Sequence, residues 1–305
     1  MNKILITGSS GFIGASLVNY LLDNMNIDIN NIFLCDHRVS NTIKTKNIIH
    51  PSNILNKEHL KQYSHIIHLG AISETNENDA NKIYQNNVLF TQELFKLSSP
   101  DSKIIFASSA SVYKSHEGPI SENYKNEKFD SLYASSKLLI DNIIRKFYTN
   151  HKIISLRFFN VCSFNLESHK KQPSPTFAFN KQIISDNKIQ VFHNSKSIYR
   201  DFIFIDDVIK IITYFMYDNK TINSEIVNIG CGTPISFYNI AHAMAMCHKL
   251  VDIEYMLPPP DLTNAYQTYT HADISKLKTL GYTNNIPTII DYINTRYIHN
   301  IKNYY

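Results

Sequence analysis

Glycine is scarce in this sequence, with 8 residues among 305, well below the usual share of roughly 7%. Glycines that cluster in such a chain therefore carry information about backbone geometry. Cysteine is also rare: Cys35, Cys162, Cys231 and Cys247 show neither metal-ligand spacing nor a disulfide framework. That usage is typical of a reducing compartment, so we expect a cytoplasmic protein without a metal site.

Long apolar runs and strong charge are absent as well. No uninterrupted apolar run approaches about 18 residues, so we expect no membrane span. The opening residues lead directly into a strand-like segment without signal-peptide architecture. The net charge is +4, and no basic run is longer than Lys170-Lys171, which argues against nucleic acid as a partner. With 43% hydrophobic and 18% charged residues, the composition is that of an ordinary globular protein.

The first half of the sequence alternates short apolar runs with stretches of helical periodicity. The apolar runs are rich in Ile and Phe and lack polar alternation, which is typical of buried parallel strands. Because strands alternate with helices, the pattern predicts an α/β fold, namely a Rossmann-type doubly wound parallel sheet. The expected strands are 3–7, 32–36, 65–70, 103–109 and 153–159.

Three of the eight glycines, Gly8, Gly11 and Gly14, lie at equal spacing between the first strand and the first helix. In that context glycines permit a tight turn, allow backbone N–H groups to reach a pyrophosphate and let the helix pack closely. The anion then lies at the positive end of the helix. The alternative is a plain tight turn, which requires no regular spacing. We therefore expect a dinucleotide cofactor here.

Asp36 lies at the end of the second strand, in the register where an acidic side chain binds an adenosine ribose. The neighbouring His37 and Arg38, with Lys44 and Lys57 further on, could instead meet a 2′-phosphate. The residues by themselves therefore leave NAD and NADP open.

The pattern loosens after about residue 160, where a polar, proline-containing stretch is typical of a loop over the end of the sheet. We see no internal repeat and no flexible linker, so we expect a smaller, discontinuous C-terminal substrate lobe. We assign residues 1–160, with about 196–228, to the NAD(P)-binding Rossmann domain, and about 161–195 and 229–305 to the substrate-binding lobe.

The second chemical signal is “YASSK”, residues 133–137, in which Tyr133 precedes Lys137 by about one helical turn. Only this tyrosine begins an amphipathic helix after a strand that ends in serines, which places Ser109 at the carboxyl edge of the sheet. Two other pairs share the spacing in less suitable contexts: Tyr124 with Lys128, and Tyr148 with Lys152.

Tyr133, Lys137 and Ser109 can together remove a proton from an alcohol. A phenol with a pKa near 10 is a poor base at neutral pH, and the charge of Lys137 favours the phenolate. Ser109 can hydrogen-bond the substrate oxygen as it changes from alcohol to carbonyl. The alternative is a surface Tyr–Lys contact at an ordinary helix N-terminus.

The motifs “TGSSGFIG”, “HLGA”, “SSASVY”, “YASSK”, “RFFNV” and “RDFIFIDDV” occur in this order across the chain. On these motifs the chain resembles the extended short-chain dehydrogenases/reductases, in their nucleotide-sugar epimerase/dehydratase group. “HLGAISETNE”, “SHK” and “YQTYTHADISKLKTLGY” are further similar to the heptose 6-epimerases of that group. Those enzymes act on an ADP-linked heptose to make a lipopolysaccharide precursor.

The resemblance implies NADP as the usual cofactor, with NAD as the alternative, and a homo-oligomer, since the heptose epimerases are pentameric. The residues that it assigns to the cofactor are Phe12 and Ile13 with the glycine turn, Asp36, His37, Lys57, Leu69, Gly70, Ala71, Ser73, Asn86, Lys137 and Val161. Those that it assigns to the nucleotide sugar are Asn160, Phe192, His193, Asn194, Ser195, Arg200 and Tyr266. From its residue type alone, Arg200 suits either a pyrophosphate or an ion pair with Asp201 or Asp206.

An epimerase that oxidises and re-reduces one carbon needs a second acid, because the hydride returns to the opposite face of the carbonyl. In the heptose epimerases a lysine of an “HK” pair has this role. The resemblance implies Lys170 here, with His169 as the alternative. Two rivals remain: another nucleotide-sugar epimerase, such as a hexose 4-epimerase, and a non-catalytic NADP-binding protein on the same fold.

Overall fold

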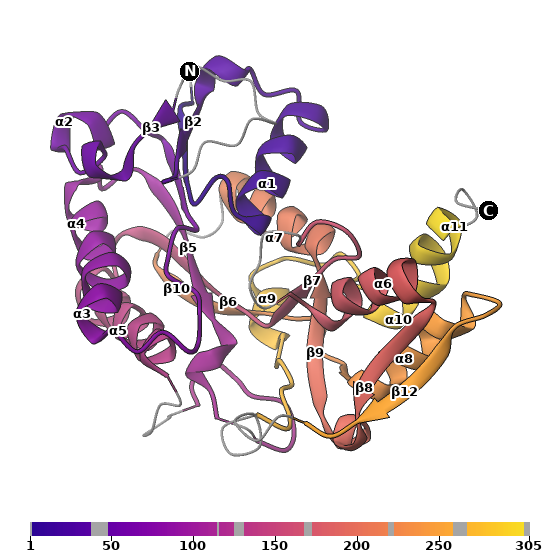
Figure 1. Cartoon of the computed structure of the whole chain (residues 1–305). Helices are drawn as coiled ribbons and strands as arrows, with labels where there is room; N and C mark the ends of the chain where they lie inside the picture. The colour runs from indigo at the N-terminus through magenta and orange to yellow at the C-terminus, as the bar shows by residue number, and fades with distance from the viewer. Residues whose placement is uncertain are drawn as a thin grey trace. The chain divides into compact units, whose positions relative to one another are not determined.

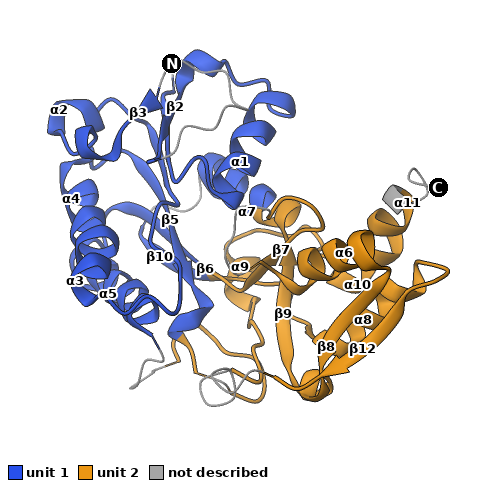
Figure 2. Ribbon diagram, in the orientation of Figure 1, with its two compact units in different colours: residues 1–112, 129–157, 209–227 blue, residues 113–128, 158–208, 228–305 orange. Residues whose placement is uncertain are grey.

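The computed structural model describes residues 2–37, 48–114, 116–124, 131–167, 173–218, 223–258 and 267–301. The chain divides into two compact units, which Figure 2 shows in different colours. Unit 1 comprises residues 1–112, 129–157 and 209–227, and unit 2 comprises residues 113–128, 158–208 and 228–305. Within the described ranges, no helix is both long and apolar enough to cross a membrane.

Unit 1 is built on a seven-stranded sheet with the strand order β10-β6-β5-β4-β1-β2-β3 (Figure 1). The pairings of β1 with β2 and β4, of β2 with β3 and of β4 with β5 are parallel. Helices α3, α4 and α5 run along one face of the sheet, and α1 and α7 along the other (Figure 1). The strands are β1 (Ile4–Thr7), β2 (Ile32–Cys35), β3 (Ile48–Ile49), β4 (His65–His68), β5 (Lys103–Ser109), β6 (Lys152–Phe158) and β10 (Glu225–Ile229). The helices are α1 (Phe12–Asp23), α2 (Lys57–Leu60), α3 (Ala80–Ile83), the π-helix η3 (Tyr84–Leu89), α4 (Phe90–Leu97), α5 (Leu132–Phe147) and α7 (Ile205–Tyr217).

All five predicted strands are present, each with ends within two residues of the expected ones. β1 and β4 are buried along their whole length, because helices cover both faces of the sheet, and this explains the lack of polar alternation. The doubly wound α/β prediction is confirmed. The sequence pattern misses β3, since two residues are too few to show a period.

Unit 2 contains a three-stranded sheet, β11-β9-β7, and a two-stranded parallel sheet, β12-β8. Its strands are β7 (Asn160–Cys162), β8 (Lys188–Phe192), β9 (Tyr199–Phe204), β11 (Pro234–Ser236) and β12 (Asp252–Met256). Its helices are α6 (Pro175–Asp186), α8 (Phe237–Met246), α9 (Ser275–Thr279), α10 (Ile289–Tyr292), the π-helix η7 (Ile293–Tyr297) and α11 (Ile298–Ile301).

The two units differ from the expected domain limits at three places. Residues 158–160 and 196–208 belong to unit 2, because β9 pairs with β7 and β11 rather than with the large sheet. Residues 113–128 also belong to unit 2, where the N–H of Ile120 donates to the His271 carbonyl at 2.9 Å. Both pairings join segments that are distant in sequence, so local periodicity does not reveal them.

The core of unit 1 supports a stability prediction. Phe95 on α4 is 2% exposed, and its ring centroid lies 5.9 Å from that of Phe106 and 5.6 Å from that of Tyr148. Phe95→Ala should lower the free energy of unfolding by about 3–5 kcal/mol, through lost burial and the cavity left behind. Phe147→Ala, which removes a ring that is 64% exposed, should change it by less than about 1 kcal/mol. Urea denaturation measures both, and equal losses would contradict the assignment of the core.

Candidate active site

The glycine turn joins β1 to α1 in unit 1. Gly8 has a φ of +68°, and its carbonyl accepts a hydrogen bond from the Gly11 N–H at 3.0 Å. A Cβ at Gly14 would lie 2.2 Å from the Gly8 oxygen, and a Cβ at Gly8 would lie 2.6 Å from the Gly70 nitrogen. The turn therefore has no room for side chains at Gly8 and Gly14. It leaves the N-terminus of α1, which begins at Phe12, beside backbone that a pyrophosphate can approach.

Asp36 follows β2 and lies against this turn. Its Oδ2 accepts a hydrogen bond from the Ser10 N–H at 2.9 Å, which is the register expected for an acidic residue that binds ribose. His37 and Lys57 are exposed, and Arg38 and Lys44 lie outside the described residues. The glycine cradle and this carboxylate fit a nicotinamide dinucleotide, whose pyrophosphate and ribose they would hold.

The segment after β4 carries four further residues that the resemblance assigns to the cofactor. The N–H of Leu69 donates to the Thr7 carbonyl at 3.1 Å, and the N–H of Gly70 donates to the Thr7 hydroxyl at 3.2 Å. The segment therefore runs beside the end of β1 and the glycine turn. Leu69, Gly70 and Ala71 are half-buried, and Ser73 is exposed.

A chain of buried hydrogen bonds that runs through His68 holds this segment in place. The Thr91 hydroxyl donates to the Asn87 carbonyl at 2.8 Å, so its oxygen accepts from Nε2–H of His68 at 2.9 Å. Nδ1 of His68 must then accept from the Thr7 hydroxyl at 2.6 Å, whose oxygen in turn accepts from Gly70. His68 is thus neutral and in one tautomer. Burial, with a smaller effect of the charge on Lys137, lowers its pKa to about 3.

The π-helix η3 contains two adjacent asparagines that differ in exposure. Asn86, which the resemblance assigns to the cofactor, is exposed, whereas Asn87 is 1% exposed. Oδ1 of Asn87 accepts from the Ile72 N–H at 2.8 Å, and its Nδ2 donates to the Ile72 carbonyl at 2.9 Å and to the Ser136 hydroxyl at 3.1 Å. Asn87 therefore connects the segment after β4 to helix α5.

Tyr133 and Lys137 lie in the first turns of α5, where the expected helix begins. The hydroxyl of Ser131 caps the helix by accepting from the Ala134 N–H at 3.1 Å. Nζ of Lys137 donates to the Ala107 carbonyl at 2.7 Å and lies 5.8 Å from the ring centroid of Tyr133. The structure thus brings the predicted Tyr–Lys pair to one face of α5, against β5.

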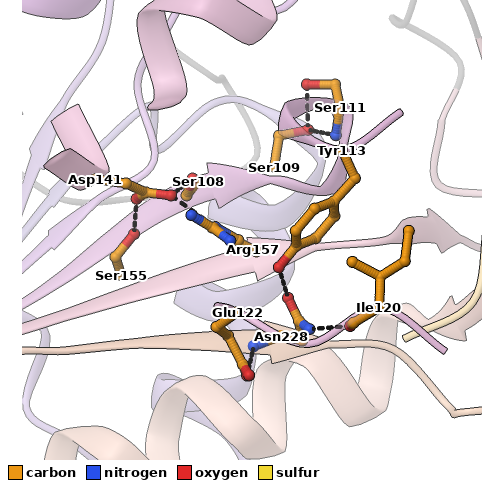
Figure 3. A network of polar contacts seen from close by, with 10 residues as sticks. All are labelled: Ser108, Ser109, Ser111, Tyr113, Ile120, Glu122, Asp141, Ser155, Arg157 and Asn228. Carbon is orange, nitrogen blue, oxygen red and sulfur yellow. Dashed lines mark hydrogen bonds and ion pairs between the residues drawn. The ribbon is translucent and has the colours of Figure 1, made fainter. Parts of the chain in front are cut away.

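Ser109 completes the predicted trio at the end of β5. Its oxygen accepts from the Ser111 N–H at 3.2 Å and from the Ser111 hydroxyl at 3.0 Å (Figure 3). Ser109 also hydrogen-bonds the side chain of Tyr133. Because two donors already point at the Ser109 oxygen, its own proton is available for Tyr133 or for a substrate oxygen.

Burial acts on both ionisable groups of the trio. It raises the pKa of Tyr133, and the hydrogen bond from Ser109 opposes this by stabilising the phenolate. Burial lowers the pKa of Lys137 to about 8, and the negative charge of Asp141 opposes it. Lys137 is only 3% exposed, so it is a cation held close to the phenol in a dry environment.

The other two Tyr–Lys pairs do not share this arrangement. Tyr148 follows the last residue of α5, and Lys152 begins β6, so the pair does not lie on one helical face. Tyr124 packs its ring against Tyr113, with centroids 6.3 Å apart, and its partner Lys128 lies outside the described residues.

Arg200 lies on β9 in unit 2 and is 5% exposed. Its guanidinium donates to the Tyr199 carbonyl at 2.9 Å and to the Gln267 carbonyl. The carboxylate of Asp201 accepts backbone N–H groups, among them that of Cys231 at 2.7 Å. Two backbone carbonyls therefore hold the guanidinium in place.

The other described residues that the resemblance assigns to the nucleotide sugar lie in unit 2. β7 pairs with β9, so that Asn160 lies opposite Phe202. Val161, which the resemblance assigns to the cofactor, follows Asn160 on the same strand. Phe192 ends β8, while His193 and Asn194 are exposed in the turn after it. Ser195 is 1% exposed, and its hydroxyl has no hydrogen-bond partner within the described part of the chain. Tyr266, His169 and Lys170 lie outside the described residues.

Unit 2 also contains a buried network next to these strands. The Tyr113 hydroxyl donates to Oδ1 of Asn228 at 2.6 Å, and Nδ2 of Asn228 donates to the Ile120 carbonyl at 2.8 Å (Figure 3). The backbone N–H of Asn228 donates to Glu122 at 2.8 Å. This network joins Tyr113, Ile120 and Glu122 to Asn228 within unit 2.

A family model described as the NAD dependent epimerase/dehydratase family matches residues 4–230. The chain belongs to this family. The match covers the glycine turn, the Ser109–Tyr133–Lys137 trio and β9, and it confirms the resemblance stated from the motifs. Family membership agrees with the dinucleotide site that the glycine turn forms.

Three known proteins are similar over almost the whole chain. An ADP-L-glycero-D-manno-heptose-6-epimerase from Brachyspira hyodysenteriae is 34% identical over 299 residues, which is 92% of each chain. The crystal structure of the enzyme of that name from Helicobacter pylori has a TM-score of 0.80 at 23% identity and covers 98% of this chain and 96% of its own. A UDP-glucuronic acid 4-epimerase from Bacillus cereus, in complex with UDP-glucuronic acid and NAD, has a TM-score of 0.73 at 25% identity and covers 99% and 100%.

Sequence reasoning misses the buried polar residues behind the site. His68 directly precedes the segment assigned to the cofactor, and Asp141 lies four residues after Lys137, which is the spacing of one helical face. These two sequence positions could have indicated a role for His68 and Asp141. No such indication exists for Asn87, because its neighbour Asn86 is the same residue type and the sequence does not show which of the two is buried.

The pKa of Lys137 gives a pH prediction. This pKa is depressed to about 8, so the ammonium is present below that pH and is lost as the pH rises through it. Because the charged lysine favours the phenolate of Tyr133, kcat of the cofactor-loaded protein should fall above about pH 8. Steady-state rates from pH 6 to 10, with circular dichroism as the control for folding, measure this. A rate that stays constant to pH 10 would contradict it.

Proposed function

We propose that this protein is a nucleotide-sugar epimerase that inverts C6 of an ADP-linked glycero-manno-heptose by transient oxidation, with tightly bound NADP, as a step towards a lipopolysaccharide core precursor. The observation that carries the proposal is the Ser109–Tyr133–Lys137 trio in the same unit as the glycine turn. The substrate comes from the relative that is 34% identical over 92% of the chain. NAD is the alternative cofactor.

Tyr133 removes the proton of the C6 hydroxyl in this mechanism. Lys137 favours the phenolate through its charge, and Ser109 donates to the substrate oxygen as the carbonyl forms. A bound nicotinamide would accept the hydride from C6 and return it to the same carbon, so no net redox change would occur. The three side chains bind, orient and deprotonate the alcohol.

Inversion needs a second acid. Because the hydride would have to return to the opposite face of the same carbon, the C6 carbonyl would turn over, and its oxygen would then point away from Tyr133. We assign the second acid to Lys170, with His169 as the alternative, on the resemblance to the heptose epimerases. A hexose 4-epimerase would work with Tyr133 alone and would not need either residue.

Unit 2 supplies side chains suited to a nucleotide sugar. The guanidinium of Arg200, which two backbone carbonyls hold in place, suits the pyrophosphate. The buried hydroxyl of Ser195, which has no partner among the described residues, suits a polar group of the ligand. We assign Asn160, Phe192–Asn194 and Tyr266 to the same ligand on the resemblance.

We also infer a cytoplasmic homo-oligomer. The four cysteines are all free thiols, which supports a reducing compartment. The oligomer rests on the resemblance alone.

The decisive experiment is incubation of the cofactor-loaded protein with ADP-D-glycero-D-manno-heptose, which should yield a mixture of C6 epimers detectable by NMR. Tyr133→Phe should lower kcat by about 10²–10⁴-fold, because it removes the acid–base group. Tyr148→Phe, the same change in the pair that does not lie on one helical face, should leave kcat within about twofold. One of the two variants Lys170→Met and His169→Ala should abolish inversion. The residue whose substitution does so is the second acid.

Three outcomes would contradict the proposal. No interconversion by folded, cofactor-loaded protein would exclude the activity. Full activity of both Lys170→Met and His169→Ala, together with turnover of a UDP-hexose, would favour a hexose 4-epimerase. No cofactor released on heating, with no turnover of any nucleotide sugar, would favour a non-catalytic protein.

A further inference from the structure

Asp141 is a fully buried carboxylate on α5, behind the catalytic trio in unit 1. Its Oδ2 accepts from Nε of Arg157 at 2.7 Å and from the Ser108 hydroxyl at 3.1 Å, and its Oδ1 accepts from the Ser155 hydroxyl at 2.6 Å (Figure 3). Asp141 is 0% and Arg157 1% exposed. Three elements, α5, β5 and β6, therefore meet at one carboxylate.

A buried ion pair of this kind is not explained by stability alone. Removing two charges from water costs several kcal/mol per ion, and well-packed apolar residues of similar volume are often at least as stable. Three hydrogen-bond donors, one of them the Arg157 guanidinium, nevertheless converge on Asp141. The cluster thus places an ion pair in the core and fixes its negative member, the Asp141 carboxylate, on the helix that carries Lys137.

The position of that charge relates it to the chemistry. Asp141 follows Lys137 by four residues on the same helix, which is one turn along one face. Ser108, which donates to Asp141, immediately precedes Ser109 on β5. The carboxylate is therefore tied to both elements that carry the trio.

The charges around Lys137 show why a fixed anion is needed there. Its neighbours are the phenol of Tyr133, the aromatic ring of Phe106 with its centroid 4.7 Å from Nζ, and His68, which is neutral. Burial favours the uncharged amine, and Asp141 is the group whose charge raises the pKa of Lys137. Without an anion nearby, an ammonium in this environment would lose its proton more readily.

We propose that Asp141 is a positioning residue for the reaction: a buried carboxylate, fixed by Arg157, Ser108 and Ser155, that keeps Lys137 charged and holds α5 in register with Ser109. The proposal rests on the proposed function only in that Lys137 must be charged for Tyr133 to act. Neither the sequence motifs nor the family match indicates this role of Asp141.

Asp141→Asn tests the proposal, because it removes the charge and keeps the size and shape of the side chain. The alkaline limb of kcat for the cofactor-loaded protein should move down by about one pH unit. KM should stay within about twofold, since Asp141 touches no substrate. Because this variant removes the carboxylate that Arg157 contacts and could fail to fold, Asp141→Asn with Arg157→Met, which removes both charges, is the second variant.

Ser155→Ala is the matched control. It removes a hydrogen bond from the same carboxylate but keeps the charge, so the midpoint of urea denaturation should fall while the pH profile of kcat stays unchanged. A purely structural role for Asp141 would give this same result for both changes. An unchanged alkaline limb in folded, cofactor-loaded Asp141→Asn and in the double variant would overturn the proposal.

A second readout does not depend on the sugar. The 15N chemical shift of Lys137 Nζ in cofactor-loaded protein, assigned with Lys137→Met, gives the ionisation midpoint of Lys137 directly. Asp141→Asn or the double variant should lower this midpoint, because the carboxylate that favours the ammonium is gone. If the wild type fails to epimerise the heptose, the proposed function fails and this readout still decides the role of Asp141. An unchanged midpoint would overturn it.

Discussion

The hydrogen bond from the buried ammonium of Lys137 to the Ala107 carbonyl, 2.7 Å long, is the interaction on which the site depends. It places a cation beside the phenol of Tyr133 where water cannot screen it, so the charge acts strongly on the phenol. The same burial works against the charge by lowering the pKa of Lys137. The surrounding core must therefore supply compensation, and the Asp141 cluster is the feature of unit 1 that does so.

The cofactor side of unit 1 is governed by a different constraint, the close approach of two backbone segments. The backbones of Gly8 and Gly70 approach so closely that a side chain at Gly8 would clash with Gly70. The buried chain from Gly70 through Thr7 and His68 to Thr91 holds this approach with neutral donors and acceptors. His68 suits that role because burial keeps it uncharged, which also avoids a second cation near Lys137.

The sequence predicts those parts of the molecule that local patterns determine. The five strands, the glycine turn and the start of α5 at “YASSK” follow from periodicity and spacing over fewer than about twenty residues. The unit limits do not, because β9 and the segment 113–128 join unit 2 through partners distant in the chain. Asp141, Asn87 and His68 are polar residues whose burial depends on tertiary contacts, and in a sequence they resemble surface residues. The register of His169 and Lys170 rests on the resemblance alone.

The proposed transient oxidation requires that the hydrogen on C6 leaves as a hydride and returns to the same carbon. The most direct test is turnover of the heptose deuterated at C6, in ordinary water, with the isotope at C6 of each epimer measured by mass spectrometry and NMR. Transient oxidation predicts that the product epimer retains the deuterium. Loss of deuterium to the solvent would contradict it, because exchange shows that the carbon was inverted by proton removal rather than by hydride transfer.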